Sequence, residues 1–349
     1  MSENYDIFLF KSTYRNEYKR LLLSALSAPK GSIFRTYYKN EHVSPDLLKE
    51  ANSSPNSFIG KKVILIFFNL KDDTPLKFYP LRNFTVQEIA PPQTRGALEF
   101  FLTPNEFYQY TDAEIKIFND NISAQMGILP PKDHSYAQFF HLQCLDELKT
   151  SLNQEAWENL VEHLDQEQIG QDDDFRKCFF LHINPLKENG AEVSYVAGNG
   201  YGLRPGKRYV LEGFFYKPRE TKESFQVKLE GSEDIEPISN QIITILPARN
   251  RPFGFEFSCK PVKIDKNTEI RIIVPEKEEG SAPRLEFQAT IHKQSIFRQI
   301  GWEEIFVLFG FIMTSLGQTL FSSLAIKMPL SIIGNFLAAF GIALLAKKY

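Results

Sequence analysis

Hydrophobic and polar residues alternate in short runs through the second half of the chain. The clearest runs cover residues 207–216 (KRYVLEGFFY), 224–231, 240–246, 253–259, 268–274 and 284–291. They are rich in β-branched and aromatic residues, and turn residues separate them. Within SFQVKLEG (224–231), apolar and polar residues take turns, as in a strand with one buried face. The pattern predicts an immunoglobulin-like β-sandwich over residues 175–292.

The first 132 residues mix two periodicities. Apolar runs at 5–10, 32–43, 61–70, 76–89 and 97–103 predict strands. Residues 12–26 place leucines at helical spacing after a serine, which is typical of a helix start. We therefore expect a small, strongly bent β-sheet or barrel with one or two packed helices. Together with the sandwich, this makes the fold class mainly β (α+β).

Residues 133–174 are acidic and predict a helical connector between the two β regions. Leu145, Leu148 and Leu152 form one apolar stripe at helical spacing. A second stripe begins at Trp157, and Asn153 is suited to the N-cap of its helix. Three adjacent aspartates at 172–174 have no matching ligands nearby, so they indicate a solvated linker, and we predict no metal site.

The end of the chain is apolar in a different way. Residues 305–326 contain no charge, which is long enough for a helix to cross a hydrocarbon core of about 30 Å. Lys327 and Pro329 interrupt, and a second uncharged run covers 328–346. Lysines and arginines flank the outer ends, which the positive-inside rule places in the cytoplasm. The pattern predicts a juxtamembrane segment at 293–304 and a two-helix transmembrane hairpin at 305–346.

Small and polar residues interrupt both predicted membrane helices. They are Ser315, Gln318, Thr319 and Ser322 on the first helix and Gly334, Asn335, Ala338 and Gly341 on the second. Their spacing places them on helix faces where small residues permit close backbone approach and polar groups avoid lipid. They are our candidate residues for membrane assembly, either by packing or by lining a wet path between assembled copies.

Composition and cysteine spacing predict the cellular compartment of the soluble part. The chain has 349 residues and a formal net charge of −3, so no global field selects a partner. Its first residues lack the positive charges of a secretion signal, and we expect the soluble part in the cytosol. Cys144, Cys178 and Cys259 lie far apart with no metal-binding or disulfide spacing, as suits a reducing compartment.

Basic and aromatic residues are interleaved between Lys11 and Lys39, the combination that holds phosphates and stacks bases. Arg15, Lys19, Arg35 and Tyr37 are the candidate ligand-binding residues. The alternative is that the lysines and arginines face water while the aromatic rings fill the core.

No motif in the sequence indicates a catalytic site. The string GNGYGLRPGKRY (198–209) resembles a phosphate loop, but its glycines are one residue too close and a strand follows it. Pro205 and Gly206 instead predict a turn. We therefore predict no catalytic residues and no cofactor, and a binding protein rather than an enzyme.

The layout of cytosolic module, β-sandwich and C-terminal hairpin resembles membrane effectors of prokaryotic anti-phage (abortive infection) systems. The resemblance is carried mainly by residues 302–348. It implies that a cytosolic protein sensor or a nucleotide ligand triggers the protein, as in Argonaute- or second-messenger-associated systems. The triggered protein would form a homo-oligomer and depolarise the inner membrane, causing cell death or dormancy.

Two other classes stay open. A passive inner-membrane anchor for a cytosolic adaptor or scaffold would accept any hydrophobic hairpin in place of the native one. A membrane-bound enzyme would need an active site in the N-terminal domain.

Overall fold

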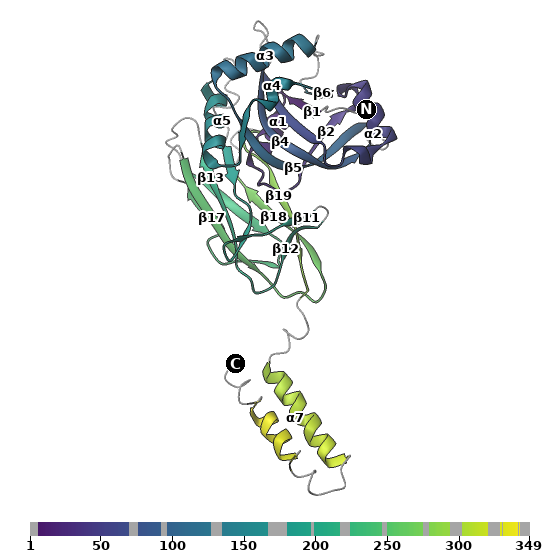
Figure 1. Cartoon of the computed structure of the whole chain (residues 1–349). Helices are drawn as coiled ribbons and strands as arrows, with labels where there is room; N and C mark the ends of the chain where they lie inside the picture. The colour runs from purple at the N-terminus through teal and green to yellow at the C-terminus, as the bar shows by residue number, and fades with distance from the viewer. Residues whose placement is uncertain are drawn as a thin grey trace. The chain divides into compact units, whose positions relative to one another are not determined.

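A computed structural model of the chain describes residues 6–69, 76–91, 96–126, 135–166, 180–196, 199–216, 224–245, 250–274, 279–293, 302–319, 329, 331–340 and 342. Its contacts divide the chain into two units. The first unit is Met1–Lys260 with Lys266–Ile291, and the second is Pro261–Asp265 with His292–Tyr349. The first unit is mainly β and contains the sheets of the described ranges (Figure 1).

The N-terminal part of the first unit is built on a curved sheet in the order β2-β5-β4-β3-β1-β6, with β7 beside β5. Only β1 and β3 run parallel among these described strands. The strands are β1 (Asp6–Lys11), β2 (Phe34–Lys39), β3 (Lys62–Asn69), β4 (Lys77–Ala90), β5 (Ala97–Gln109), β6 (Ser135–Phe140) and β7 (Lys149–Ser151).

The sheet bends into a half-barrel, which agrees with the predicted bent sheet. Its two longest strands, β4 and β5, shift register between Arg82 and Phe84 and again between Val86 and Glu88. Such bulges increase local twist and let a long strand pair change direction. Apolar residues of both faces of the sheet and of its helices form one core that also includes Phe180 and Tyr216 of the sandwich.

Helices cover the curved sheet (Figure 1). They are α1 (Asn16–Ser27), α2 (Pro45–Ser53), α3 (Asp112–Met126), α4 (Gln143–Asp146) and α5 (Gln154–Gln166), with short 3-10 turns at Asn40–His42 and Pro55–Phe58. The apolar stripe of α5 is buried, as its helical spacing predicts. Asn153 is its N-cap, since its side-chain oxygen accepts a hydrogen bond from the backbone N–H of Ala156 at 2.9 Å.

Two further sheets follow, and they agree with the predicted β-sandwich. One has the order β10-β9-β13-β17-β15 with β8 beside β13: β8 (Phe180–Ile183), β9 (Lys187–Glu188), β10 (Ala191–Glu192), β13 (Tyr209–Tyr216), β15 (Ile235–Pro237) and β17 (Asn250–Cys259). The other has the order β11-β12-β19-β18-β14-β16: β11 (Tyr195–Val196), β12 (Gly200–Leu203), β14 (Phe225–Gly231), β16 (Ile242–Ile245), β18 (Lys266–Ile273) and β19 (Leu285–Ile291).

The alternation seen in the sequence is the alternation of burial in these strands. In β14, Val227 and Leu229 are buried, and Gln226 is exposed. The phosphate-loop-like string forms β12 and a turn in which Gly206 has φ 72°, a conformation that favours glycine. The turn expected at Pro205 and Gly206 is therefore confirmed.

The prediction of a helical segment over residues 133–174 is wrong in part. Residues 135–140 form β6, which pairs with β1, and residues 149–151 form β7, which pairs with β5. The edge of β1 offers unpaired backbone groups that a neighbouring strand satisfies, and this tertiary demand overrides local helix preference. The three aspartates at 172–174 lie outside the described residues.

The second unit contains α7 (Trp302–Thr319) and a further helical stretch at residues 331–340. None of the helices in the described ranges combines the length and the apolar character that crossing a bilayer requires. The predicted first membrane helix covered residues 305–326, whereas α7 starts earlier, so Glu303 and Glu304 fall within its eighteen residues. Residues 320–328 and 343–349 lie outside the described residues, as do residues 294–301 of the predicted juxtamembrane segment.

Candidate functional site

The four predicted ligand-binding residues separate into two groups. Arg35 and Tyr37 are two positions apart on the exposed face of β2, and both line one pocket. Arg15 is exposed at the N-cap of α1, and its guanidinium lies 5.6 Å from the centre of the Tyr18 ring. Lys19 is only 7% exposed. The structure therefore brings Arg35 and Tyr37 together at a site and leaves Arg15 and Lys19 out of it.

We call this site the junction pocket, because the N-terminal sheet and the sandwich both contribute to it. Its volume is about 750 Å³. Its walls come from α1, from β2 and β5, and from the start of β19. Its charged lining residues are Arg20, Arg35, Lys39, Arg284, Glu17, Glu99 and Glu286. Pockets of this size at domain junctions are common sites for small molecules.

Local periodicity explains how α1 and β2 present these side chains. Glu17, Arg20, Leu21 and Ser24 recur at helical spacing, so one face of α1 meets the pocket. Along β2, burial alternates residue by residue. Arg35, Tyr37 and Lys39 point outward, and Phe34, Thr36 and Tyr38 are buried. The pocket is thus built from a polar helix face and the polar face of an edge strand.

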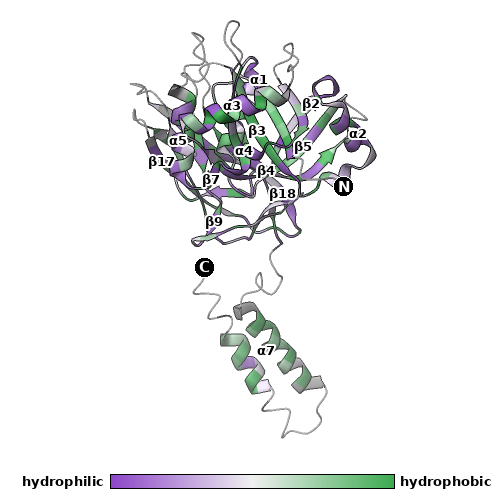
Figure 2. Ribbon diagram, turned by 45° about the horizontal axis from the view of Figure 1, so that its top comes forward, coloured by the Kyte–Doolittle hydropathy of each residue, from purple (hydrophilic) through white to green (hydrophobic). Residues whose placement is uncertain are grey.

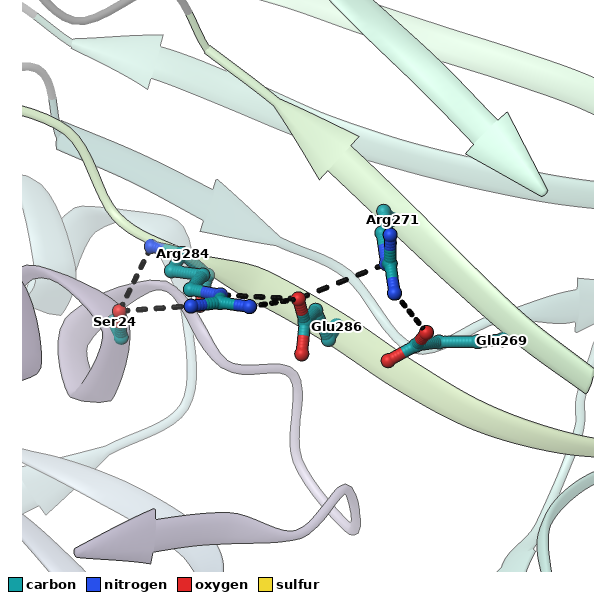
Figure 3. A network of polar contacts seen from close by, with 5 residues as sticks. All are labelled: Ser24, Glu269, Arg271, Arg284 and Glu286. Atoms are coloured by element: carbon teal, nitrogen blue, oxygen red, sulfur yellow. Dashed lines mark hydrogen bonds and ion pairs between the residues drawn. The ribbon is translucent and has the colours of Figure 1, made fainter.

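An ion pair stands on each of two walls. Arg35 Nη2 lies 2.7 Å from Glu99 Oε2 of β5. Across the junction, Arg284 donates through Nε and Nη2 to Glu286 Oε1 at 3.0 and 2.8 Å (Figure 3). In both pairs the arginine is the more exposed partner, at 54% against 15% and at 70% against 33%. All four side chains line the pocket, and the two guanidinium groups are its more exposed members.

Tyr37 supplies an aromatic ring to the same pocket. Its ring is 40% exposed, and its hydroxyl donates a hydrogen bond to Glu17 of α1. This hydrogen bond, together with partial burial, raises the pKa of Tyr37 to about 12. The tyrosine is therefore neutral at physiological pH, and its ring is held in a fixed orientation.

The sandwich contacts α1 directly beside the pocket. The backbone N–H of Arg284 donates to Ser24 Oγ at 3.0 Å, and Ser24 Oγ donates to the Arg284 carbonyl at 3.2 Å (Figure 3). Gly280 has φ +80°, and a Cβ there would lie 2.5 Å from the Asn16 carbonyl oxygen. Only glycine permits this close approach. The segment that leads into β19 is thus seated on α1.

The far end of α1 is held by a buried arginine. Arg82 of β4 donates through Nη1 to the carbonyls of Ala25 and Ala28 at 2.8 and 2.6 Å, and through Nε to that of Asn105 at 2.9 Å. Burial lowers the pKa of Arg82 to about 9, so it remains a cation at neutral pH. A cation is favourable at the carbonyl end of a helix dipole. Arg82 therefore anchors the helix that forms one wall of the pocket.

Lys11 is a second buried cation close to the pocket wall. Its Nζ donates to the Tyr37 carbonyl at 3.2 Å and lies 3.7 and 4.7 Å from the ring centres of Tyr38 and Tyr18. Burial lowers the pKa of Lys11 to about 7, and the nearby Glu17 carboxylate opposes that shift. Lys11 thus satisfies a backbone acceptor on β2 from the end of β1.

Sequence reasoning missed most of the lining of the junction pocket. Arg284 directly precedes β19 and Glu286 lies in it, far along the chain from Arg35. No spacing or composition signal connects residues that only the fold brings together. Arg20 and Lys39 belong to the basic, aromatic-interleaved region, so that region did carry a partial signal.

The candidate assembly residues lie partly in a close contact between α7 and residues 331–340. A Cβ on Gly334 would lie 2.7 Å from the Gly310 carbonyl oxygen, and a Cβ on Gly310 would lie 2.5 Å from the Ala338 nitrogen. Thr314 Oγ1 lies 3.4 Å from Asn335 Oδ1. The two helices, which we call the helix pair, therefore touch backbone to backbone through their small residues.

The remaining assembly candidates are placed less fully. Ser315 is exposed on α7. Gln318 and Thr319 belong to the last turn of α7, but their side chains lie outside the described part of the chain. Ser322 and Gly341 are also outside it. Gly334 and Ala338 are buried within the helix pair itself.

The helix pair consists largely of hydrophobic residues (Figure 2). Its exposed large apolar side chains are Leu308, Phe309, Phe311, Ile312, Leu316, Ile332, Ile333, Phe336, Phe340 and Ile342. Small residues inside and large apolar residues outside are the reverse of the arrangement in a water-soluble helix pair.

Within the described ranges, no three His, Cys, Asp or Glu side chains gather closely enough to hold a metal ion. Cys144 and Cys259 are free thiols, and burial raises the pKa of each. Neither thiol has the lowered pKa that a reactive cysteine needs.

Comparison with known proteins gives no family. No family model matches the chain, and no curated protein matches it. The cupredoxin domain of amoB from Nitrosocaldus yellowstonii is similar over 26% of this chain and 61% of its own, with 13% identity and a TM-score of 0.18. A FixG-related protein from Vibrio parahaemolyticus covers 33% of this chain and 97% of its own (14% identity, TM-score 0.22).

A trypsin-activated alpha-2-macroglobulin from Escherichia coli covers 64% of this chain and 11% of its own, with 8% identity and a TM-score of 0.24. At TM-scores this low, these likenesses carry no argument about the function of the chain.

Proposed function

We propose that this protein is a membrane-acting effector whose C-terminal helix pair enters a lipid bilayer and whose body detects the trigger. The observation that carries the proposal is the reversed polarity of the helix pair. Its inside is lined by Gly310, Gly334 and Ala338, and its outside is covered by large apolar side chains. Lipid covers such a surface without a specific partner.

The energetics favour a covered state. Leaving a large apolar side chain in water instead of burying it is unfavourable by roughly 1.5–3 kcal/mol. Ten such side chains project from the helix pair, among them Phe336 at 70% exposed. No charged residue lies between Ile305 and Ile326 or between Met328 and Ala346, so no charged side chain within either run offsets this penalty. A bilayer removes this penalty and accepts the glycine-mediated contact between the helices.

The rest of the chain supplies a route for a trigger. β19 lines the junction pocket with its first residues and leads at its other end to His292 and the C-terminal segment. The layout resembles effectors of prokaryotic immune systems, and that resemblance supports a cytosolic protein or nucleotide as trigger. On this proposal the body lies in the cytoplasm, copies assemble at the inner membrane, and the assembly depolarises it.

One observation favours a second candidate, a passive membrane anchor for an adaptor. Gly334 and Ala338 are already buried in the contact between the two helices of one chain. This leaves fewer small residues to join neighbouring copies, and an anchor needs none. An anchor requires only that the helix pair stays in the membrane. An effector requires in addition that the helix pairs of several copies assemble and depolarise the membrane.

Membrane potential separates the two candidates. The full chain is expressed in bacteria with and without its genomic neighbours, beside a chain that ends at Arg298. An effector predicts depolarisation that needs residues beyond Arg298. An unchanged potential in every condition, with the full chain in the membrane fraction, would leave the anchor as the better account.

Two substitutions sharpen this test. Phe336→Glu places a charge on the outer surface and should move the protein out of the membrane fraction, since a central charge opposes insertion by about 2.5–3.5 kcal/mol. Phe336→Leu is its matched control and should leave the fraction unchanged. Gly334→Leu should keep the protein in the membrane but abolish depolarisation, because a side chain there separates the helices.

A further inference from the structure

We propose that the junction pocket binds a nucleotide, with the phosphates between Arg35 and Arg284 and the base against Tyr37. The inference concerns binding alone, so it does not depend on the membrane activity proposed above. It rests on the size of the pocket, on the greater exposure of the arginine in each of its two ion pairs, and on the exposed tyrosine in its lining.

The charges favour an anion. Arg35 and Arg284 belong to different walls, and each is more exposed than the glutamate that holds it. Ion pairs this exposed contribute little stability, so replacing a carboxylate contact by a phosphate contact is inexpensive. Guanidinium groups bind phosphate oxygens through two parallel hydrogen bonds. Arg20 and Lys39 add two further cations to the lining.

Arg284 is also held rigidly. Its backbone is fixed by two hydrogen bonds to Ser24, and Glu286 is itself within 3.6 Å of Arg271 Nε (Figure 3). Arg271 in turn contacts Glu269, so a row of alternating charges runs along β18 and β19 from the pocket. A guanidinium group that is already oriented loses less side-chain entropy when it binds a ligand.

Tyr37 favours a planar group on the ligand. Its ring is exposed to the pocket while its hydroxyl is tied to Glu17, so stacking requires no rearrangement. Stacking of a base on an aromatic side chain contributes without regard to base identity. A ligand that combines a planar ring and phosphates satisfies both features at once, which neither a simple anion nor an apolar molecule does.

The volume argues for a small nucleotide rather than a polymer. About 750 Å³ lies within the range of small-molecule sites. The start of β19 bounds the pocket on one side, and Ser24 fastens that strand to α1. A bound nucleotide would therefore contact the N-terminal sheet and the last sandwich strand together, and would strengthen the junction between them.

Direct titration tests this inference. The full chain in mild detergent is titrated with the fluorescent nucleotides mant-ATP and mant-GTP. We expect saturable, submillimolar binding to at least one of them. Arg35→Gln and Arg284→Gln should each weaken it about tenfold, and Tyr37→Leu should weaken it by about the same factor. Arg208→Gln, which breaks an exposed ion pair with Glu256 outside the pocket, should leave the affinity unchanged.

Competition identifies the ligand class. Unlabelled nucleotide should displace the probe at least about tenfold better than adenosine, which lacks the phosphates, or inorganic pyrophosphate, which lacks the base. Arg35→Lys keeps the charge but not the planar fork, so it should retain part of the affinity. Equal displacement by pyrophosphate, no saturable binding of either probe, or an equal loss in Arg208→Gln would overturn the inference. Unchanged melting temperatures show that the variants are folded.

Discussion

Replacing Lys11 by methionine should change how the stability of the N-terminal domain depends on pH. Lys11 is buried against two tyrosine rings, and its pKa is lowered from 10.5 to about 7 because burial disfavours the charged amine. In the unfolded chain the amine has its ordinary pKa. Methionine has a similar length and carries no charge, so the variant removes the titration while it keeps most of the packing.

The sign follows from proton binding. Below pH 7 Lys11 is protonated in both states, and the folded state carries the full penalty of a buried charge. Between about pH 7 and 10.5 the folded protein has released the proton and the unfolded chain has not, so stability rises with pH, by at most about 1.4 kcal/mol per pH unit. From pH 7 to pH 9 the native protein should gain about 2 kcal/mol relative to Lys11→Met.

Guanidinium denaturation at several pH values measures this difference. Trp157 is buried in the N-terminal core and reports its unfolding, and a Trp302→Phe background removes the other tryptophan. The quantity of interest is the free energy of unfolding of the native protein minus that of Lys11→Met. If this difference is the same at pH 7 and pH 9, Lys11 keeps an ordinary pKa in the folded protein and our account of its burial is wrong.

Three further substitutions test the contacts that hold α1, the segment before β19, and the start of α5. Arg82→Ala removes the donor for three carbonyls and leaves a cavity, so it should destabilise the protein by about 3 kcal/mol or more in the same assay; a loss below about 1 kcal/mol would contradict this. Gly280→Ala should cost about 2 kcal/mol by thermal melting, whereas Gly254→Ala, whose Cβ would make an ordinary contact with Glu212 Cγ at 3.7 Å, should be nearly neutral. Asn153→Ala should cost about 1 kcal/mol and Asn153→Asp much less, and equal losses would argue against the cap.

The strands of the sandwich were predictable because their signal is local. β14, β17 and β19 alternate apolar and polar residues over much of their length, and burial follows that alternation. The cap of α5 was predictable for the same reason, since Asn153 contacts its own helix. Such features depend on neighbours within a few residues.

β6 shows where local reasoning fails. Residues 135–140 were expected to be helical, yet they pair with β1 from more than a hundred residues away. Lys11 and Lys19 show the same limit, because their charges suggested exposure and the fold buries both. The contacts that decide these cases are absent from the surrounding sequence.

The sequence by itself determined most strands of the sandwich, their alternating faces and the apolar character of the C-terminal segment. These follow from periodicity and composition, which are properties of consecutive residues. Only the tertiary structure decided that Arg35 and Arg284 share a pocket, that each pairs with a glutamate there, and that Gly310 faces Gly334. These depend on how the chain folds back on itself, and distance along the sequence carries no information about it.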